Sequence, residues 1–147
     1  MSRSKVESFL SADDEKEIVE AIRIAEKFTS GEIRVHLEPA TEEDPLKHAA
    51  DIFHHLGMDR TEARNGVLIY IAVVAHKFVI YGDKGIYEKV PHDFWEITRD
   101  EMQRYFKEGR FKQGIIAGVL SAGEQLQKYF PWQRDDINEL PDEVSKG

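Results

Sequence analysis

The sequence predicts a three-layer α/β/α sandwich, in which a small mixed β-sheet is flanked by about four helices. Two observations lead to this class. Segments with apolar residues at helical spacing alternate along the chain with short segments typical of strands. One strand–helix–strand unit, residues 32–74, is expected to form a right-handed parallel crossover, after which a hairpin adds an antiparallel strand.

The first expected helix begins after Ser11, whose side chain can cap it, and its first turns are acidic, as the helix dipole favours. Apolar residues then recur at helical spacing up to Phe28, and Gly31 is expected to stop the helix. The next segment, residues 32–38, strictly alternates polar and apolar side chains. This pattern predicts a strand with one buried face, near an edge of the sheet.

A second helix is expected to open at Asp44-Pro45 and to end at Gly57, because proline suits the first position of a helix. The run 67–74 is apolar at every position. It predicts a central strand covered by helices on both faces. A tight connection leads to residues 77–81, which are expected to pair with that strand as a hairpin.

Two further helices are expected in the last third of the chain. The first follows Pro91 and is broken by Gly109, and the second runs from about residue 111 to residue 129. Gly114 and Gly118 lie in the second of these helices. Small residues at this spacing favour close packing against a neighbouring helix.

Length and composition limit the classes of function. The chain has 147 residues, 28 acidic and 20 basic side chains, a formal net charge of -8 and no cysteine. We expect one domain, residues 1–130, followed by an acidic, irregular C-terminal tail, residues 131–147. The acidic balance argues against nucleic acid as a partner and against an anionic membrane surface. The absence of cysteine removes disulfides, thiolate metal sites and a cysteine nucleophile.

No apolar leader follows Met1, and the longest apolar run, residues 67–75, is far shorter than the roughly 20 residues of a membrane helix. We therefore expect a soluble, cytoplasmic protein with no membrane-spanning segment.

A candidate cation site follows from the predicted topology. The loops before the first two strands lie at the same end of the sheet as the loop after the antiparallel third strand. Carboxylates, an amide and glycine-bearing turns converge there, and such hard oxygen ligands suit calcium or magnesium. The alternative is that these segments are simply good turns. The residues concerned are Ser30, Gly31, Glu32, Glu62, Arg64, Asn65, Gly66, Gly82, Asp83, Gly85 and Glu88.

Two other clusters also contain ligand-type side chains. His48, Asp51 and His55 have the spacing that places them on one side of the second helix, where they form either a transition-metal site or a solvated polar face. The opposite end of the sheet is a second acidic region near basic residues. It comprises Glu38, Glu42, Glu43 and Asp44, with Lys107, Glu108 and Arg110 nearby.

Motifs of common enzyme classes are absent. The sequence has no phosphate-binding Walker loop, no Gly-x-Ser-x-Gly elbow and no Gly-x-Gly-x-x-Gly fingerprint. We assign no catalytic residue. A hydrolase that uses carboxylates and a metal would depend on the cation site described above.

Several segments, in this order and spacing, resemble the TPM domain family over most of residues 8–130. The most recognisable is Arg64-Asn65-Gly66-Val67-Leu68-Ile69, which is similar to the entry of the family's central strand. The other matching segments are residues 29–35, 49–57, 77–82 and 106–114.

The resemblance implies an α/β/α sandwich, and calcium binding and acid phosphatase activity are both associated with the family. Carried over by position, the implied metal ligands are Glu32, Asn65, Asp83 and Glu88. The first hypothesis is a non-catalytic, calcium-binding accessory module. The alternatives are a metal-dependent acid phosphatase and a protein-interaction domain whose partner docks on the acidic tail.

Overall fold

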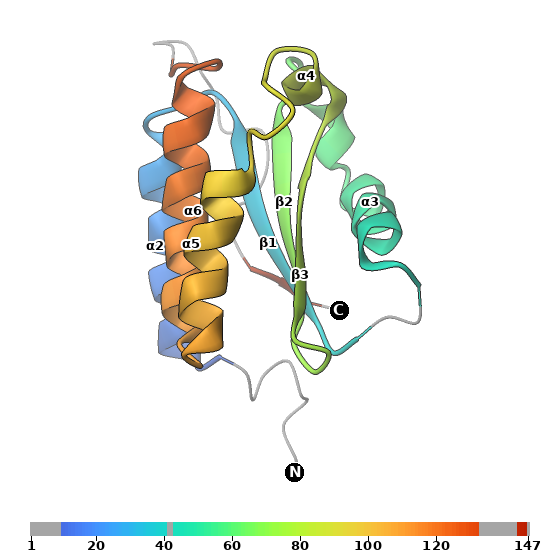
Figure 1. The fold of residues 1–147 in the computed structure, drawn as a ribbon. Coiled ribbons are helices and arrows are strands. Elements are labelled where there is room, and N and C mark those ends of the chain that lie inside the picture. Colours follow the sequence, from blue (N-terminus) through green and yellow to red (C-terminus); the bar gives the residue numbers. More distant parts are fainter. Residues whose placement is uncertain (1–9, 41–42, 133–143, 147) are drawn as a thin grey trace.

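The computed structural model describes residues 10–40, 43–132 and 144–146, and its elements are labelled as in Figure 1. In chain order these are α2 (Ala12–Glu26), β1 (Glu32–Glu38), α3 (Pro45–His55), the 3-10 helix η1 (Met58–Arg60), β2 (Gly66–Ala72), β3 (Lys77–Gly82), α4 (Lys84–Tyr87), α5 (Glu96–Lys107), α6 (Phe111–Gln127) and β4 (Ser145–Lys146).

The four strands form one mixed sheet in the order β3-β2-β1-β4. Strand β1 is parallel to both β2 and β4, whereas β3 is antiparallel to β2. Helices α2, α5 and α6 form a layer on one face of the sheet, and α3 lies on the other face (Figure 1). The three-layer α/β/α fold and the mixed sheet expected from the sequence are therefore confirmed.

The sheet borders a hydrophobic core on each face, because successive side chains of a strand point to opposite faces. The two cores differ in size. The larger core joins the three-helix layer to alternate residues of the strands, such as Val35 and Ile69. The smaller core lies against α3 and is centred on Phe53, Leu68 and Tyr70. Both cores consist of side chains that are almost completely removed from water.

Helix α2 starts as expected, but it ends earlier. The Ser11 Oγ atom accepts from the Asp14 N–H at 3.0 Å, and the Asp14 carboxylate accepts from the Ser11 N–H at 3.2 Å. This is a capping box. The helix ends at Glu26 with Lys27 in right-handed conformation, so the prediction that Gly31 stops it was wrong. Gly31 instead lies where a Cβ atom would come within 3.0 Å of Leu126.

Strand β1 lies next to the edge strand β4, so it is near an edge of the sheet as expected, but the expectation of a single buried face is wrong. All seven of its residues are buried, including the polar ones, because β2 pairs along one side and β4 pairs with His36 and Leu37 on the other. The alternating pattern therefore identified the strand correctly but gave the wrong exposure for its polar face. The pairing partner that makes it interior comes from the far end of the sequence.

That partner lies in the segment expected to be an irregular acidic tail. Ser145 and Lys146 form β4 and pair with β1 in parallel, which the sequence did not predict. The rest of the expected tail that the structure describes is Pro131, Trp132 and Val144, while residues 133–143 lie outside the described residues. Docking of a partner on this tail therefore stays a hypothesis.

Helices α5 and α6 pack as closely as their glycines predict. A Cβ atom on Gly114 would lie 2.5 Å from Phe106 Cε1, and one on Gly118 would lie 2.5 Å from Met102 Sδ. Helix α5 begins at Glu96, a few residues later than the expectation that it follows Pro91.

Candidate functional site

Three of the four candidate ligands gather at one end of the sheet. Glu32 is the first residue of β1, Asn65 immediately precedes β2, and Asp83 immediately follows β3. The Glu32 N–H donates to the Asn65 carbonyl at 3.4 Å, and the Asp83 N–H donates to the Gly66 carbonyl at 2.9 Å. The strand pairing thus places Glu32 and Asp83 on either side of Gly66, at the same end of the sheet as Asn65, as the topological argument predicts.

The Asp83 side chain is held by a cation from the protein itself. Arg64 donates to both of its carboxylate oxygens, from Nε to Oδ2 at 2.7 Å and from Nη2 to Oδ1 at 3.0 Å. This is the bidentate geometry that suits arginine and carboxylate. The hydrogen bond from Arg64 to Asp83 is the main reason why the pKa of the guanidinium is raised above its usual range. Asp83 also caps α4, because its Oδ1 accepts from the Lys84 N–H at 2.7 Å.

Next to this ion pair, the backbone of Gly85 packs closely against the loop that carries Arg64. Arg64 has a φ of 52°, in the left-handed region that side chains other than glycine seldom adopt. Its carbonyl accepts from the Gly85 N–H at 2.9 Å. A Cβ atom on Gly85 would lie 2.3 Å from the Ala63 carbonyl oxygen, so only glycine fits there. The approach positions α4 and Asp83 against the loop that carries Arg64.

The other three predicted ligands differ in burial and in their distance along the chain from the Arg64–Asp83 ion pair. The Asn65 side chain donates to Ser30 Oγ at 3.4 Å and is buried, as is Glu32. Glu88 lies at the far end of the short helix α4 and is exposed. Within the described residues it forms no ion pair. The structure therefore brings Glu32, Asn65 and Asp83 together and leaves Glu88 at the surface.

The His48, Asp51 and His55 cluster separates into one inward and two outward side chains. Asp51 and His55 are exposed, whereas His48 is directed at the C-terminal end of β1. Across residues 10–40, 43–132 and 144–146, no group of three or more histidine or acidic side chains is arranged to hold a metal ion.

A second polar cluster is centred on the Glu38 carboxylate at the opposite end of β1; the sequence analysis placed Glu38 and His48 in two separate clusters and missed His36 and Tyr70. His36 Nε2 lies 2.9 Å from Oε1, the Tyr70 hydroxyl donates to Oε2 at 2.7 Å, and His48 Nε2 lies 2.6 Å from Oε2. We call His36, Glu38, His48 and Tyr70 the Glu38 network. Tyr70 has no exposed surface, and His36 and Glu38 are buried.

The protonation states in the Glu38 network follow from its contacts. Burial raises the pKa of Glu38, but hydrogen bonds from His36 and Tyr70 and the adjacent His48 outweigh it, so the pKa lies below its ordinary value. Burial lowers the pKa of His36, despite its hydrogen bond to Glu38. Burial, and then the contact with Glu38, raise the pKa of Tyr70. The network is therefore a carboxylate that accepts from a phenol and a neutral imidazole.

The tautomer of His36 can be assigned from its two partners. A carboxylate only accepts, so Nε2 carries the proton that His36 donates to Glu38. The Nδ1 atom then accepts from the Ser145 hydroxyl, which lies 3.0 Å away on β4. The Glu38 network thereby reaches from the helix α3 to the edge strand β4.

Part of this network was visible in the sequence. His36 and Glu38 are two residues apart on one strand and so share a face. The parallel register aligns His36 with Tyr70, and the two rings stack with centroids 6.0 Å apart. The sequence pattern could show that the first two residues share a face. It could not show which residue of β2 lies opposite them.

The fold and these polar clusters define an α/β/α domain with ionisable groups gathered at both ends of β1. The family profile of the TPM domain matches residues 4–125. The chain therefore belongs to the TPM domain family, as the sequence resemblance indicated.

Solved structures agree with this assignment. The chain is 59% identical to the BA42 protein from the psychrophilic bacterium Bizionia argentinensis, with 99% of this chain and 100% of that one covered and a TM-score of 0.92. The N-terminal domain of a P. gingivalis protein shares the fold at 19% identity, with coverages of 83% and 79% and a TM-score of 0.67. The N-terminal domain of the cg2496 protein from Corynebacterium glutamicum does so at 13% identity, with coverages of 94% and 80% and a TM-score of 0.63.

A comparison with curated proteins found no match. Among the described helices, none has the length and apolar character needed to cross a membrane.

Proposed function

We propose that this TPM domain is a non-catalytic accessory module that binds a divalent cation, calcium in the first instance, at the sheet end formed by Glu32, Asn65 and Asp83. The observation that supports the proposal is the presence of two carboxylates and an amide at one end of the sheet, where three neighbouring strands begin or end. Carboxylate, amide and backbone carbonyl oxygens are the ligands that calcium prefers. The net charge of -8 also favours a cation over an anion.

The oxygen atoms of Glu32, Asn65 and Asp83 are of the type that calcium prefers. In this structure, however, the Asp83 oxygens are not free to bind a metal ion. Both Asp83 oxygens accept from Arg64, so the guanidinium occupies the place of a competing cation. Calcium binding therefore requires Arg64 to release Asp83. Glu88, which is exposed on α4, can supply a further oxygen from the surface.

This competition gives a direct test. We expect calcium at millimolar concentration to shift the backbone amide signals of residues near Asn65 and Asp83 in two-dimensional NMR, and to raise the melting temperature by mass action. Replacing Arg64 by glutamine removes the competitor and should tighten binding. Glu32→Gln removes a ligand and should weaken it. The matched control is Glu62→Gln, a loss of one exposed carboxylate in the neighbouring loop.

The absence of saturable shifts in the wild-type protein would overturn the proposal, as would equal weakening by Glu32→Gln and Glu62→Gln. Phosphate-ester hydrolysis lost on Asp83→Ala or on addition of a chelator would favour the acid phosphatase alternative instead. Hydrolysis that survives both changes would indicate a contaminating enzyme.

A further inference from the structure

A cavity of about 230 Å³ opens between the β2–β3 hairpin and the three-helix layer. Its apolar wall includes Ile71 from β2, Phe78 from β3, Phe106 from α5 and Phe111 from α6. The Phe78 and Phe106 rings meet edge to face with centroids 5.2 Å apart, and Phe106 and Phe111 lie 5.8 Å apart. The cavity is thus lined by three phenylalanine rings from three elements. It lies at the end of the sheet opposite to Glu32, Asn65 and Asp83, and its lining includes no residue of the Glu38 network.

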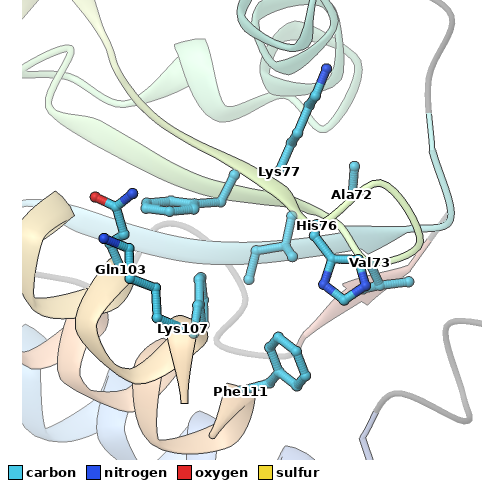
Figure 2. Close-up of a pocket in the computed structure, with 10 residues that line it drawn as sticks. Ala72, Val73, His76, Lys77, Gln103, Lys107 and Phe111 are labelled. Carbon is cyan, nitrogen blue, oxygen red and sulfur yellow. The ribbon is translucent and has the colours of Figure 1, made fainter. Parts of the chain in front are cut away.

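The mouth of this cavity is polar. Gln103 and Lys107, both exposed on α5, lie on one side, and His76, from the hairpin turn, lies with Phe111 on the other (Figure 2). Lys77 contributes to the lining, but its side chain extends away from Gln103 and Lys107 (Figure 2). Lys107 is therefore the charged group that borders the opening.

The Lys107 ammonium forms no ion pair with any described residue. The acidic side chain that follows it, Glu108, pairs with Arg110, with Nη1 and Oε2 3.6 Å apart. A cation that has no ion-pair partner among the described residues and lies at the edge of an apolar cavity is complementary to an anion, even though the chain as a whole is acidic.

The size and lining of the cavity limit the ligand. A cavity of roughly 150 Å³ lined by apolar side chains accommodates one benzene molecule, and pockets for drug-sized ligands begin at about 300 Å³. A volume of about 230 Å³ therefore suits one ring with a short substituent. Aromatic walls favour an aromatic guest, because ring pairs gain energy beyond the area that they bury.

We propose that this cavity binds a small aromatic carboxylate, with its ring between Phe78, Phe106 and Phe111 and its carboxylate at Lys107. The Gln103 amide lies on the same side of the mouth as Lys107 and can donate a hydrogen bond to the same carboxylate, whereas His76 lies across the opening (Figure 2). The inference is independent of the proposed cation site, because it uses none of its residues.

The probe for this proposal is 3-phenylpropionate, titrated into the isotope-labelled protein and followed by two-dimensional NMR. We expect saturable shifts at Phe78, Phe106 and Lys107. The neutral analogue 3-phenylpropionamide should bind more weakly. The variant Lys107→Met, which keeps an unbranched apolar side chain at an exposed position, should raise the Kd about threefold or more, as the loss of a partly desolvated ion pair predicts.

The matched control is Arg104→Met, which removes one positive charge from α5 at an exposed position that does not line the cavity. It should leave the Kd unchanged. The proposal is overturned if no saturable shift occurs at these residues, or if the amide binds as tightly as the acid. Equal weakening by the two variants would likewise overturn it, because the effect would then be that of net charge alone.

Discussion

His48 Nε2, on α3, lies 2.6 Å from Glu38 Oε2, at the end of β1. The same oxygen accepts from the Tyr70 hydroxyl on β2 at 2.7 Å. Oε2 of Glu38, a residue of β1, therefore links helix α3 to β2, and α3 is the helix that connects these two strands in the chain. The Nδ1 atom of His48 faces a second carboxylate, with Glu43 Oε2 at 3.4 Å.

Tyr70→Phe should lower the free energy of unfolding by about 1–3 kcal/mol, because it removes a buried hydrogen bond to a charged acceptor while keeping the ring. It should also raise the pKa of Glu38, which the hydrogen bond from Tyr70 helps to lower. Urea denaturation measures the first effect, and NMR titration of the carboxyl carbon measures the second. Tyr81→Phe is the control, since the Tyr81 hydroxyl forms no hydrogen bond within the described residues. Equal losses in the two variants would contradict the prediction.

Stability should fall with acidification from about pH 6.5 downward. The pKa of His36 is lowered from its ordinary value of 6.5, so below this pH the unfolded chain binds a proton that the folded one excludes. This contribution is complete above pH 6.5 and is lost as the pH falls toward the folded-state pKa. The lowered pKa of Glu38 also makes stability fall with acidification, but in a lower pH range that starts near the ordinary pKa of 4.5.

Denaturation midpoints measured between about pH 8 and pH 5 would test this, since one differentially bound proton gives at most about 1.4 kcal/mol per pH unit. His36→Gln should flatten the decline in this range, whereas His55→Gln, at an exposed position, should leave it unchanged. A decline that His36→Gln does not alter would assign the effect to other groups.

Ser145→Ala should destabilise the protein by about 0.5–1.5 kcal/mol, because it leaves His36 Nδ1 without its donor in a buried position. The variant should also increase hydrogen exchange at Leu37, which pairs with Lys146. The control is Ser121→Ala, which removes the hydroxyl 2.9 Å from Thr98 Oγ1 between α5 and α6. Exchange at Leu37 that rises equally in both variants would mean a general loss of stability.

Gly123→Ala should destabilise the contact between α2 and α6. The added Cβ atom would lie 2.8 Å from the Cβ and 3.1 Å from the Cα of Ala25, so a helix backbone would have to shift. Overpacking of this kind costs about 1–3 kcal/mol, more than the roughly 1 kcal/mol that alanine gains over glycine in a helix. Thermal unfolding measures the difference. Glu124→Ala, at the next and exposed position, should have little effect; a Gly123→Ala variant as stable as the wild type would disprove the close contact.

Local patterns were sufficient to predict the layers of this fold. The cap at Ser11, the apolar run of β2 and the glycines of α6 each act through neighbours in sequence or through one helix face, and their roles are confirmed. The pairing of β1 with β4 was not predictable in this way. The interior place of β1 depends on Ser145 and Lys146, and no local pattern marks two residues as a strand.

The candidate sites show the same division between local and distant information. Strand directions sufficed to place Glu32, Asn65 and Asp83 at one end of the sheet. The partner of Asp83 could not be derived from spacing, because it depends on the left-handed conformation of Arg64 and on the approach of Gly85. The burial of His36 and Glu38 also depends on tertiary contacts.

The pairing of β4 with β1 has a kinetic consequence. His36 and Ser145 are 109 residues apart, so their contact closes a loop that contains nearly every other element. Closing a long loop carries an entropic cost, and contacts of high sequence separation slow folding. The pairing of a two-residue strand contributes little free energy to offset that cost. We therefore expect β4 to join a sheet that β1, β2 and β3 have already formed, and to be the first strand to detach when the protein opens.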